Sequence, residues 1–363
     1  MVSGNAAVLS IPAQWADITP AWMTTAISRR HPDAQVAEVR LLLNDDGTNR
    51  RARFGLTYSS GSGPATVFAK AESDTPQIRE AHVRNGNMFN EPLLLNSEVS
   101  LPIEHPFAYM AVIDEPGLNY LIVMEDLVAR GADPRNVMRP LSVDQVASGV
   151  RGLARLHGHY WNRVANHPAL EWVQPFLPTQ GWQAPMKDGI RAGIERTKRV
   201  LPGAVTKLSG EELQSLWSRY IGSLTKGPQT LLHGDPHVGN SYILPDGEVG
   251  FLDWQVVRSG NWSLDVGYFI QSALTEEDRQ RSEVDLLEEY RISLGIMSGQ
   301  CPSSEEAWLR YRASVAHGLI IWLVTAASTK QVHSPEICLE MVQRYAAAFA
   351  ELDTPAALDL MRA

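Results

Sequence analysis

The chain has 363 residues, 44% hydrophobic and 20% charged, a globular composition with enough length for two units that each have a core. The 32 basic and 41 acidic residues give a net charge of −9, which argues against a non-specific nucleic-acid surface. The two cysteines, Cys301 and Cys338, support neither a disulfide framework nor a thiolate zinc site, so a reducing, cytoplasmic setting is expected.

The first 125 residues are predicted to form a small β-rich lobe. The start of the chain lacks a charged segment followed by an apolar run, so we expect no signal peptide. A helix is expected to begin at Thr19-Pro20, a capping residue followed by proline. Residues 77–95 are expected to be helical but irregular, because they contain Gly86 and Pro92. Strand-forming runs between turn signals predict five antiparallel strands, at Val36–Leu43, Arg51–Tyr58, Thr66–Lys70, Phe107–Ile113 and Tyr120–Met124.

The remaining residues, 126–363, are predicted to be mainly helical. Ser142 and Gln145 form a capping-box pattern, and apolar residues then repeat at three- and four-residue spacing along one helix face. His157 lies on that apolar face, so it is interpreted as a packed core histidine.

Two segments further along the chain differ from an ordinary amphipathic helix. Residues 241–244 and 249–252 predict a β-hairpin around a Pro-Asp-Gly turn. Residues 315–327 are apolar, but they contain His317 and are too short to span a bilayer. They are interpreted as a buried helix, and no membrane is expected as a partner.

The polar groups with the clearest chemistry lie in residues 231–240, Leu-Leu-His-Gly-Asp-Pro-His-Val-Gly-Asn, and 251–255, Phe-Leu-Asp-Trp-Gln. Phosphoryl transfer from ATP needs metal ligands near the phosphates and a carboxylate that accepts the hydroxyl proton. Mg²⁺ takes oxygen ligands, usually one or two carboxylates with phosphates and water. Asp235 and Asn240 share one loop, and Asp253 follows at the end of a hairpin strand. This layout can bring a base, an amide oxygen and a carboxylate around one phosphate.

The pattern resembles the catalytic signature of the aminoglycoside phosphotransferase and choline-kinase-like family. That signature reads His-x-Asp-x-x-x-x-Asn, here from His233 to Asn240, followed by an apolar pair and Asp253-Trp254. Within the family, the chain is most similar to the ecdysteroid-kinase-like branch, over residues 40–275. Three further segments support the resemblance: Leu153–Trp161, Asp253–Gln255, and Gly260 with Asp265–Phe269.

The resemblance implies a two-lobed α+β fold like that of protein kinases, with ATP and Mg²⁺ as cofactors. Residues 1–125 would form a small antiparallel β lobe that binds ATP. Residues 126–363 would form a larger, mainly helical lobe that carries the catalytic residues and binds the acceptor. The hinge between the lobes is expected near Glu125.

The resemblance also implies a role for each residue of the signature. Asp235 would be the catalytic base, and Asn240 and Asp253 would be catalytic residues that hold Mg²⁺. His233 would brace the loop, and Asp265 would anchor it from the following helix.

Nucleotide binding is assigned to the first lobe. Such a lobe needs a lysine on its third strand for the α- and β-phosphates, paired with a helix glutamate. Lys70 ends the predicted third strand, and its partner is Glu91 or Glu98. Glu91 is favoured because its distance to the next strand resembles the family pattern, from which Pro92 departs.

Two further nucleotide contacts depend on the backbone. Gly47 and Thr48 cradle phosphate if their amides point inward, whereas a plain hairpin turn is the alternative. The family docks adenine on an inter-lobe strand, here from Glu125 to Leu127.

Residues 161–200 are expected to form the acceptor side, and their composition favours an apolar or acidic hydroxylated small molecule over a polycationic aminoglycoside. Five basic residues outnumber two acidic ones: Lys187, Arg191, Arg196, Lys198 and Arg199 against Asp188 and Glu195. The apolar and aromatic residues are Trp161, Trp172, Phe176, Trp182 and Met186. The alternative is that the aromatic residues are core and the charges cover a solvated helix face.

The sequence therefore predicts a small-molecule kinase. The alternatives are an aminoglycoside-type antibiotic kinase and a catalytically silent binding module. A protein kinase is disfavoured, because Pro236-His237 follows Asp235 and Trp254-Gln255 follows Asp253. A metallohydrolase using His233, Asp235 and His237 would need further His or Asp clusters. His237 is expected to pack in the loop or contact substrate. The oligomeric state is left open.

Overall fold

The computed structural model describes residues 9–45, 47–97, 99–177, 180–328 and 333–361, with the backbone only for residues 180–185. The chain divides into two compact units, which are described separately. The N-terminal unit contains residues 1–98 and 106–131, and the C-terminal unit contains residues 99–105 and 132–363.

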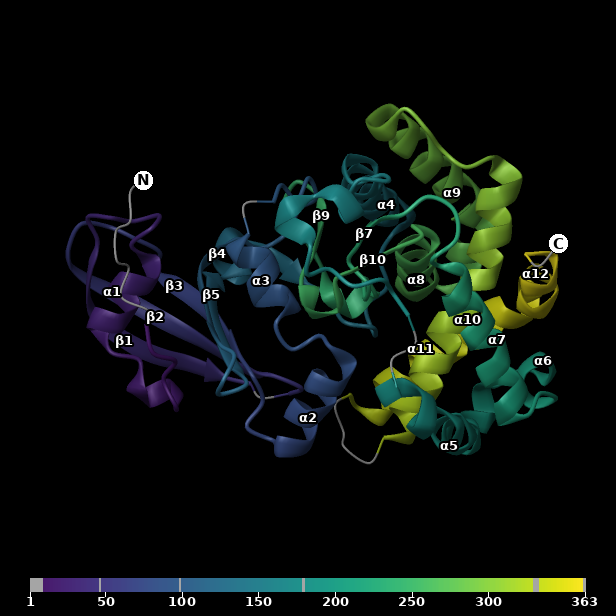
Figure 1. Cartoon of the computed structure of the whole chain (residues 1–363), viewed down its shortest axis with the longest axis horizontal. Helices are drawn as coiled ribbons and strands as arrows, with labels where there is room; N and C mark the ends of the chain where they lie inside the picture. The colour runs from purple at the N-terminus through teal and green to yellow at the C-terminus, as the bar shows by residue number, and fades with distance from the viewer. Residues whose placement is uncertain (1–8, 46, 98, 178–179, 329–332, 362–363) are drawn as a thin grey trace. The chain divides into compact units, whose positions relative to one another are not determined.

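The N-terminal unit is built on one antiparallel sheet, as predicted (Figure 1). Its strands, in the spatial order β1-β2-β3-β5-β4, are β1 (Gln35–Asn44), β2 (Arg50–Ser60), β3 (Thr66–Ala71), β4 (Ala108–Asp114) and β5 (Asn119–Glu125). Ala52, Phe54 and Leu56 of β2 are buried and alternate with half-buried residues, the pattern of a strand with one face on a core. Helix α1 (Pro20–Ile27) packs on this core through Trp22 and Met23.

The helical region expected at residues 77–95 forms two helices, α2 (Pro76–Asn85) and α3 (Asn90–Asn96). Gly86 ends α2 with a φ of 62°, a left-handed conformation that glycine adopts without a steric penalty. The described part of the unit therefore contains three α-helices, α1, α2 and α3, where two helical regions were expected. Two 3₁₀ helices complete it, η1 (Trp15–Asp17) and η2 (Leu127–Arg130).

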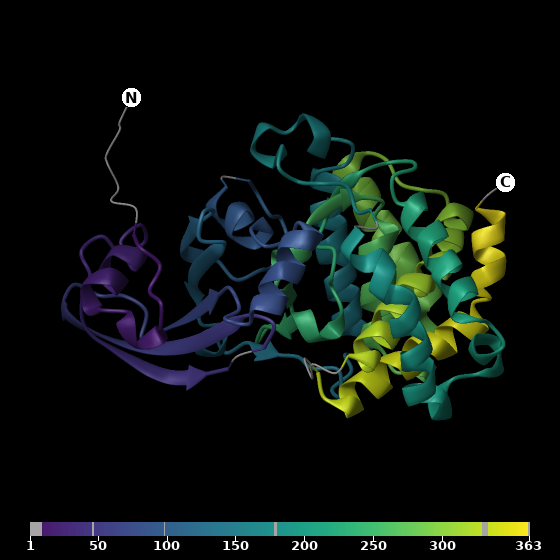
Figure 2. The same ribbon diagram turned by 60° about the horizontal axis from the view of Figure 1, so that its bottom comes forward.

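The C-terminal unit is mainly helical (Figure 2). Its α-helices are α4 (Val143–His159), α5 (Gln180–Thr197), α6 (Gly203–Thr206), α7 (Gly210–Ser223), α8 (Ser263–Ala273), α9 (Glu276–Ser298), α10 (Ser304–Ala327), α11 (Pro335–Glu351) and α12 (Thr354–Leu360). Its 3₁₀ helices are η3 (Val164–Asn166), η4 (Pro168–Leu170), η5 (Lys198–Val200), η6 (Val238–Asn240) and η7 (Trp254–Val256). The capping box that begins α4 is confirmed, because Gln145 N donates to Ser142 Oγ and Ser142 N donates to Gln145 Oε1.

Two small sheets interrupt the helices of this unit. The predicted hairpin is confirmed as β8 (Ser241–Ile243) and β9 (Val249–Phe251), and β6 (Asp133–Pro134) pairs with β8. The second sheet pairs β7 (Thr230–Leu232) with β10 (Arg258–Gly260) and was not predicted. Strands of two or three residues are too short for a period-two pattern to be recognised. They matter here because β7, β8 and β9 border the segments that carry the catalytic signature.

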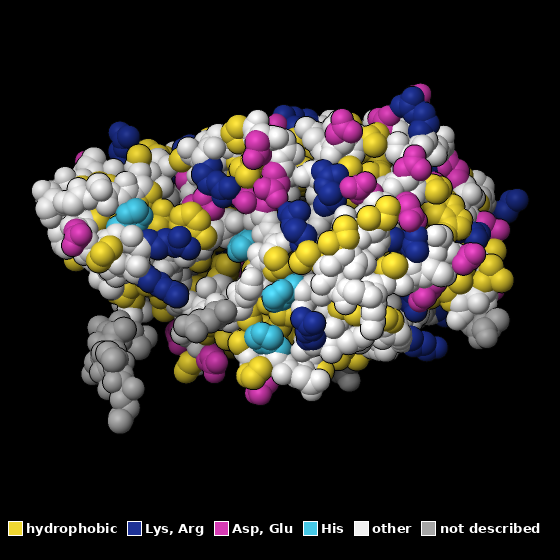
Figure 3. All heavy atoms as spheres, turned by 90° about the horizontal axis from the view of Figure 1, so that it is seen from above, with side chains coloured by type: hydrophobic (Ala, Val, Ile, Leu, Met, Phe, Trp, Pro, Cys, Tyr) yellow, Lys and Arg dark blue, Asp and Glu magenta, His cyan; other side chains and the backbone are white. Residues whose placement is uncertain are grey.

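The apolar stretch 315–327 belongs to α10, and residues 315–320 of this stretch are buried. None of the helices in the described part of the chain is long and apolar enough to cross a bilayer. On the face shown in Figure 3, basic and acidic side chains are interspersed and do not form a continuous patch of one sign.

Candidate active site

The candidate site is built around the loop between β7 and β8. This loop begins at His233, and residues 238–240 close it as η6. Two hydrogen bonds tie it to the end of β9: Leu252 N donates to Asn240 O at 2.9 Å, and His233 Nε2 lies 3.0 Å from Leu252 O. Because Asp253 follows Leu252 directly, these bonds hold its carboxylate beside the loop.

Asp235 and Asn240, five residues apart, are brought into direct contact. Asn240 Nδ2 donates to Asp235 O at 2.9 Å and lies 3.2 Å from Asp235 Oδ2. This use of the amide nitrogen leaves the amide oxygen as the group that Asn240 can offer to another partner. Oxygen is the donor atom that Mg²⁺ prefers.

Asp265, at the start of α8, anchors the loop through its backbone. Its carboxylate is fully buried and accepts two backbone hydrogen bonds, from His233 N at 2.7 Å and from Gly234 N at 3.0 Å. Gly234 has a φ of +87°, and a Cβ atom there would lie 2.1 Å from Val256 O. Only glycine fits this position without a backbone shift. The two hydrogen bonds to Asp265 thus fix the backbone of the loop at His233 and Gly234.

His157 of α4 extends this anchor into the core. It is fully buried, with Nε2 3.1 Å from Asp265 Oδ2 and Nδ1 2.8 Å from the Tyr290 hydroxyl. A neutral imidazole that donates from Nε2 and accepts at Nδ1 satisfies both contacts. His157 is thus a core histidine, as interpreted from the helix pattern. Its link to the loop anchor was missed, because spacing along one helix does not reveal a partner 108 residues away.

The electrostatics of the loop centre on two neighbouring carboxylates. The pKa of Asp235 is raised well above its ordinary value. Desolvation is the largest cause, and the negative charge of Asp253 is the second. Hydrogen bonds from Asn240 and from the Tyr268 hydroxyl act in the opposite direction. Asp253 itself has a φ of 66°, a left-handed conformation that is uncommon for a non-glycine residue and that concentrates at functional sites.

His237 packs in the loop and also faces Asp235. Its Nδ1 accepts from Gly239 N at 3.0 Å, and its Nε2 lies 3.9 Å from Asp235 Oδ2. Its ring lies edge-on to Tyr268 and Trp322, with centroids 5.9 and 5.4 Å away. Desolvation lowers the pKa of His237 to about 3, so the ring is neutral at neutral pH. No role at the site was predicted for Tyr268 or Trp322, because nothing in their spacing distinguishes them from other core aromatics.

The arrangement of side chains argues against the metallohydrolase alternative. No three His, Cys, Asp or Glu side chains among the described residues converge in a way that could hold a metal. His233 Nδ1 accepts from Asp235 N at 3.3 Å, and its other ring nitrogen faces Leu252 O. Mg²⁺ needs only one or two protein carboxylates besides phosphates and water, and Asp253 with Asn240 meets that smaller requirement.

In the N-terminal unit, the predicted lysine forms a buried ion pair. Lys70 Nζ lies 2.6 Å from Glu91 Oε2, and both side chains are less than a tenth exposed. Lys70 is on β3 and Glu91 is in the first turn of α3. Glu98, the alternative partner, lies outside the described residues. A contribution of this pair to nucleotide binding stays a prediction.

The segment around Gly47 and Thr48 forms a closed turn between β1 and β2. Gly47 N donates to Asn49 O at 2.9 Å, and Thr48 Oγ1 lies 3.5 Å from Asn49 Oδ1. The amide of Gly47 is therefore used within the turn, which favours the hairpin alternative. A phosphate contact from this turn stays a prediction.

Glu125 and Leu127 lie at the end of the N-terminal unit. Glu125 is the last residue of β5, and its Oε1 accepts from Phe107 N at 3.0 Å and from Arg130 Nη1 at 2.9 Å. Leu127 begins η2. The side chain of Glu125 is thus engaged locally, and adenine docking on this backbone stays a prediction.

Two of the five apolar and aromatic residues expected on the acceptor side belong to the core. Trp161 and Met186 are buried, and the ring of Phe176 packs edge-on against His317 at 5.6 Å. Trp172 Nε1 donates to the nearby Ala169 O, whereas the side chain of Trp182 lies outside the described residues. The aromatic residues therefore give little support to an apolar acceptor. Of the five basic residues, Arg196 and Arg199 line a cavity.

Sequence comparison places this site in a known family. The profile of the ecdysteroid kinase-like family matches residues 101–297, which contain every residue of the loop, its anchor and Asp253. The chain belongs to the ecdysteroid kinase-like family. This family membership confirms the resemblance drawn from the catalytic signature. No curated protein matches the chain in sequence.

Comparison with solved structures confirms that this family member has a protein-kinase-like fold. A spectinomycin phosphotransferase, solved with ADP and spectinomycin, superposes with a TM-score of 0.51 at 10% identity, over 93% of this chain and 99% of that one. A choline kinase from Cryptosporidium parvum gives a TM-score of 0.50 at 11% identity, over 90% of this chain and 92% of that one. At such identities the likeness concerns the fold alone.

Proposed function

We propose that this protein is an ATP-dependent phosphotransferase that phosphorylates a hydroxyl group of a small molecule, with Asp235 as the base. The observation that carries the proposal is the contact between Asp235 and Asn240. It lies on a loop fixed by the buried carboxylate of Asp265. The backbone bond from Leu252 to Asn240 holds Asp253 at the same loop. Membership of a kinase-like family supports the same reaction class.

In the proposed reaction, Asp235 orients the acceptor hydroxyl and takes its proton as the oxygen attacks the γ-phosphorus of ATP. The bond from that phosphorus to the β,γ-bridging oxygen breaks, so the products are a phosphate ester, ADP and one proton. The hydrogen bond from Asn240 holds the Asp235 carboxylate in place for this role.

Asn240 and Asp253 are the residues proposed to hold Mg²⁺, through an amide oxygen and a carboxylate. The ion would neutralise charge on the β- and γ-phosphates. Lys70, oriented by Glu91, is proposed to contact the α- and β-phosphates. Backbone groups between Glu125 and Leu127 are proposed to receive the adenine.

The acceptor is proposed to be neutral or acidic rather than polycationic. The support comes from the cavity that Arg196 and Arg199 line in the C-terminal unit, because like charges repel a cationic ligand.

A nucleotide-binding experiment tests the cofactor part of the proposal. Thermal unfolding is measured with ATP, with and without Mg²⁺, for the wild type and for Asp253→Asn. A ligand at about 100 times its Kd stabilises a protein by about 2.7 kcal/mol, which moves the midpoint by a few degrees. We expect a Mg²⁺-dependent shift that Asp253→Asn abolishes. Absence of a shift with any nucleoside triphosphate would favour a binding module that has lost its cofactor.

A kinetic experiment tests the base. ADP release is measured over a panel of neutral, acidic and aminoglycoside hydroxyl compounds, and Asp235→Asn is then compared with the wild type on the best acceptor. We expect turnover to fall by about 10²–10⁴-fold, while the ATP-dependent thermal shift is retained. Asp285→Asn, an exposed site on α9, is the control and should leave turnover unchanged. Near-full activity of Asp235→Asn would show that another group accepts the proton.

A further inference from the structure

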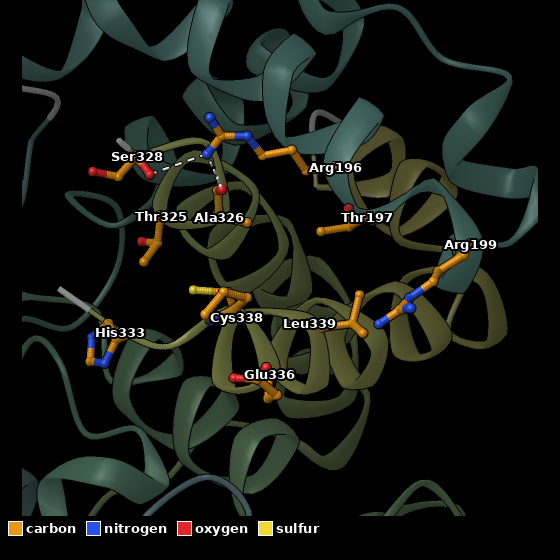
Figure 4. A pocket seen from close by; sticks show the side chains of 11 residues that line it. Arg196, Thr197, Arg199, Thr325, Ala326, Ser328, His333, Glu336, Cys338 and Leu339 are labelled. Atoms are coloured by element: carbon orange, nitrogen blue, oxygen red, sulfur yellow. Dashed lines mark hydrogen bonds between the residues drawn. The ribbon is translucent and has the colours of Figure 1, made fainter. Parts of the chain in front are cut away.

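A cavity of about 490 Å³ opens in the C-terminal unit where the end of α5 and η5 meet the end of α10 and the start of α11 (Figure 4). Polar and charged side chains line much of it, among them Arg196, Arg199, Thr325, His333, Glu336 and Cys338. Figure 4 shows these side chains arranged around one space, with the sulfur of Cys338 directed into it.

The two arginines of the cavity, Arg196 and Arg199, differ in how many contacts they make. Arg196 Nη1 donates to Ala326 O at 2.8 Å and to Ser328 O at 3.1 Å, so its guanidinium is fixed at the end of α10 by one of its nitrogens. Arg199 is exposed and forms no ion pair with any residue that the structure describes. Guanidinium groups bind carboxylates and other oxyanions through paired hydrogen bonds. Arg196 and Arg199 therefore leave donors available for a bound anion.

The cavity also contains the carboxylate of Glu336. Hydrogen bonds from its own backbone N–H and from the Ser334 hydroxyl lower the pKa of this group. The carboxylate is thus hydrogen-bonded at the start of α11, and the described lining of the cavity contains two guanidinium groups and one carboxylate. The balance of charge in the cavity favours an anion.

A row of aromatic rings joins this cavity to the catalytic loop. His333, at the cavity rim, lies 5.2 Å from the ring of Trp322, and Trp322 lies 5.4 Å from the ring of His237. His237 Nε2 is in turn 3.9 Å from Asp235 Oδ2. These contacts show that the rim of the cavity and the proposed base are separated by only two packed side chains, Trp322 and His237.

We propose that the cavity binds the anionic end of the acceptor, so that the substrate is a hydroxylated acid with an apolar middle. The hydroxyl lies at Asp235, the acidic group binds Arg196 and Arg199, and the apolar part spans the separation between these two ends. This assignment rests on the proposed phosphotransferase function. It defines the substrate class by two requirements, an anionic group and a fixed separation between that group and the hydroxyl.

The test uses ω-hydroxy carboxylic acids of increasing chain length, each paired with its neutral methyl ester. Binding is measured by calorimetry without ATP, for the wild type, Arg199→Gln and Lys198→Gln. Lys198 is the matched control, because it is the neighbouring exposed cation, pairs with Glu195 at 3.8 Å and does not line the cavity. Arg196 is left intact, because it holds the end of α10.

We expect the acids to bind about 10-fold more tightly than their esters, as one charge-assisted pair at a partly exposed site would give. Arg199→Gln should reduce the difference, because only Arg196 then remains for the acid, whereas Lys198→Gln should preserve it. Affinity should peak at one chain length. Esters that bind as tightly as acids would overturn the proposal, as would equal effects of the two substitutions.

ADP release with the tightest acid then separates this proposal from the proposed function. Phosphorylation of the acid, with a higher KM in Arg199→Gln and an unchanged KM in Lys198→Gln, supports both. If neutral hydroxyl compounds are phosphorylated and the bound acid is not, the cavity does not hold the acceptor and the assignment fails while the function stands. If the acid binds through Arg199 and no hydroxyl compound of any charge is phosphorylated, the proposed function fails, and with it the assignment of the cavity to an acceptor.

Discussion

Replacement of the buried loop anchor by its isosteric amide, Asp265→Asn, is expected to destabilise the C-terminal unit and displace the catalytic loop. The carboxylate of Asp265 accepts from His233 N at one oxygen and from Gly234 N at the other. Asparagine keeps the shape of the side chain but has only one acceptor oxygen, and its second terminal atom is a donor. In either orientation of the amide, one backbone N–H therefore faces another N–H.

The magnitude follows from that mismatch. A hydrogen bond to a charged acceptor contributes about 1.5–3 kcal/mol, and a buried donor left unsatisfied costs about 1–3 kcal/mol. Asp265 is fully buried, so water does not replace the lost partner. We expect a loss of about 2–4 kcal/mol in the free energy of unfolding, because the two effects overlap in one group.

The measurement is urea-induced unfolding followed by far-UV circular dichroism, whose signal comes mainly from the helices of the C-terminal unit. Asp285→Asn makes the same chemical change at an exposed position of α9 and should lie within about 0.5 kcal/mol of the wild type. If Asp265→Asn is as mild as Asp285→Asn, the loop is not held by this carboxylate, and the anchoring argument is refuted.

Three further changes test other parts of the structure. Gly234→Ala should cost at least about 1 kcal/mol more than Gly247→Ala in urea unfolding, because both glycines have positive φ but only the first has backbone in the way of a Cβ atom; equal costs would mean that the neighbouring backbone yields easily. Burial lowers the pKa of His317 from 6.5 to about 3, so the unfolded chain binds a proton below pH 6.5 that the folded chain does not. Stability is unaffected by this group above pH 6.5 and falls by about 1.4 kcal/mol per pH unit between those two values. His317→Gln should remove that share of the slope, and identical slopes would contradict the assignment. Lys70→Met and Glu91→Gln should each cost about 3 kcal/mol by breaking a buried ion pair, with the double variant less costly than the sum; additive costs would show that the two charges are not coupled.

The architecture of each unit could be predicted where local signals were strong. Runs of strand-forming residues between turn signals located all five strands of the first sheet, and a side-chain cap at Ser142 marked the start of α4. The two-residue and three-residue strands β6, β7 and β10 carry no such periodic signal, because their pairing depends on residues distant in the sequence. The break at Gly86 was only partly visible, since a glycine alone does not show that a second helix follows.

The candidate site shows the same division between local and distant information. Asp235 and Asn240 are close in sequence, so their contact could be predicted from a motif. The contributions of His157 and Trp322 could not, because each reaches the loop from a separate helix. The aromatic residues of the expected acceptor side left two interpretations open for a related reason. The composition of a segment shows that it contains aromatic residues. Whether one of them, such as Trp161, faces the core depends on how the segment packs.

The seven residues 99–105 have a consequence for how the chain is made and divided. They belong to the C-terminal unit, although residues on both sides of them belong to the N-terminal unit. In the C-terminal unit, Glu104 Oε1 accepts from the Tyr242 hydroxyl at 2.7 Å, and Glu104 O accepts from Phe251 N at 2.9 Å. Ser100 O accepts from the Tyr160 hydroxyl. A fragment that starts after Gly131 lacks all of these contacts.

The segment is synthesised before Tyr160, Tyr242 and Phe251, so its contacts with them can form only after those residues have been made. The two units are consequently not separated by a single boundary along the chain. A single cut after Gly131 would therefore separate residues 99–105 from the C-terminal unit to which they belong.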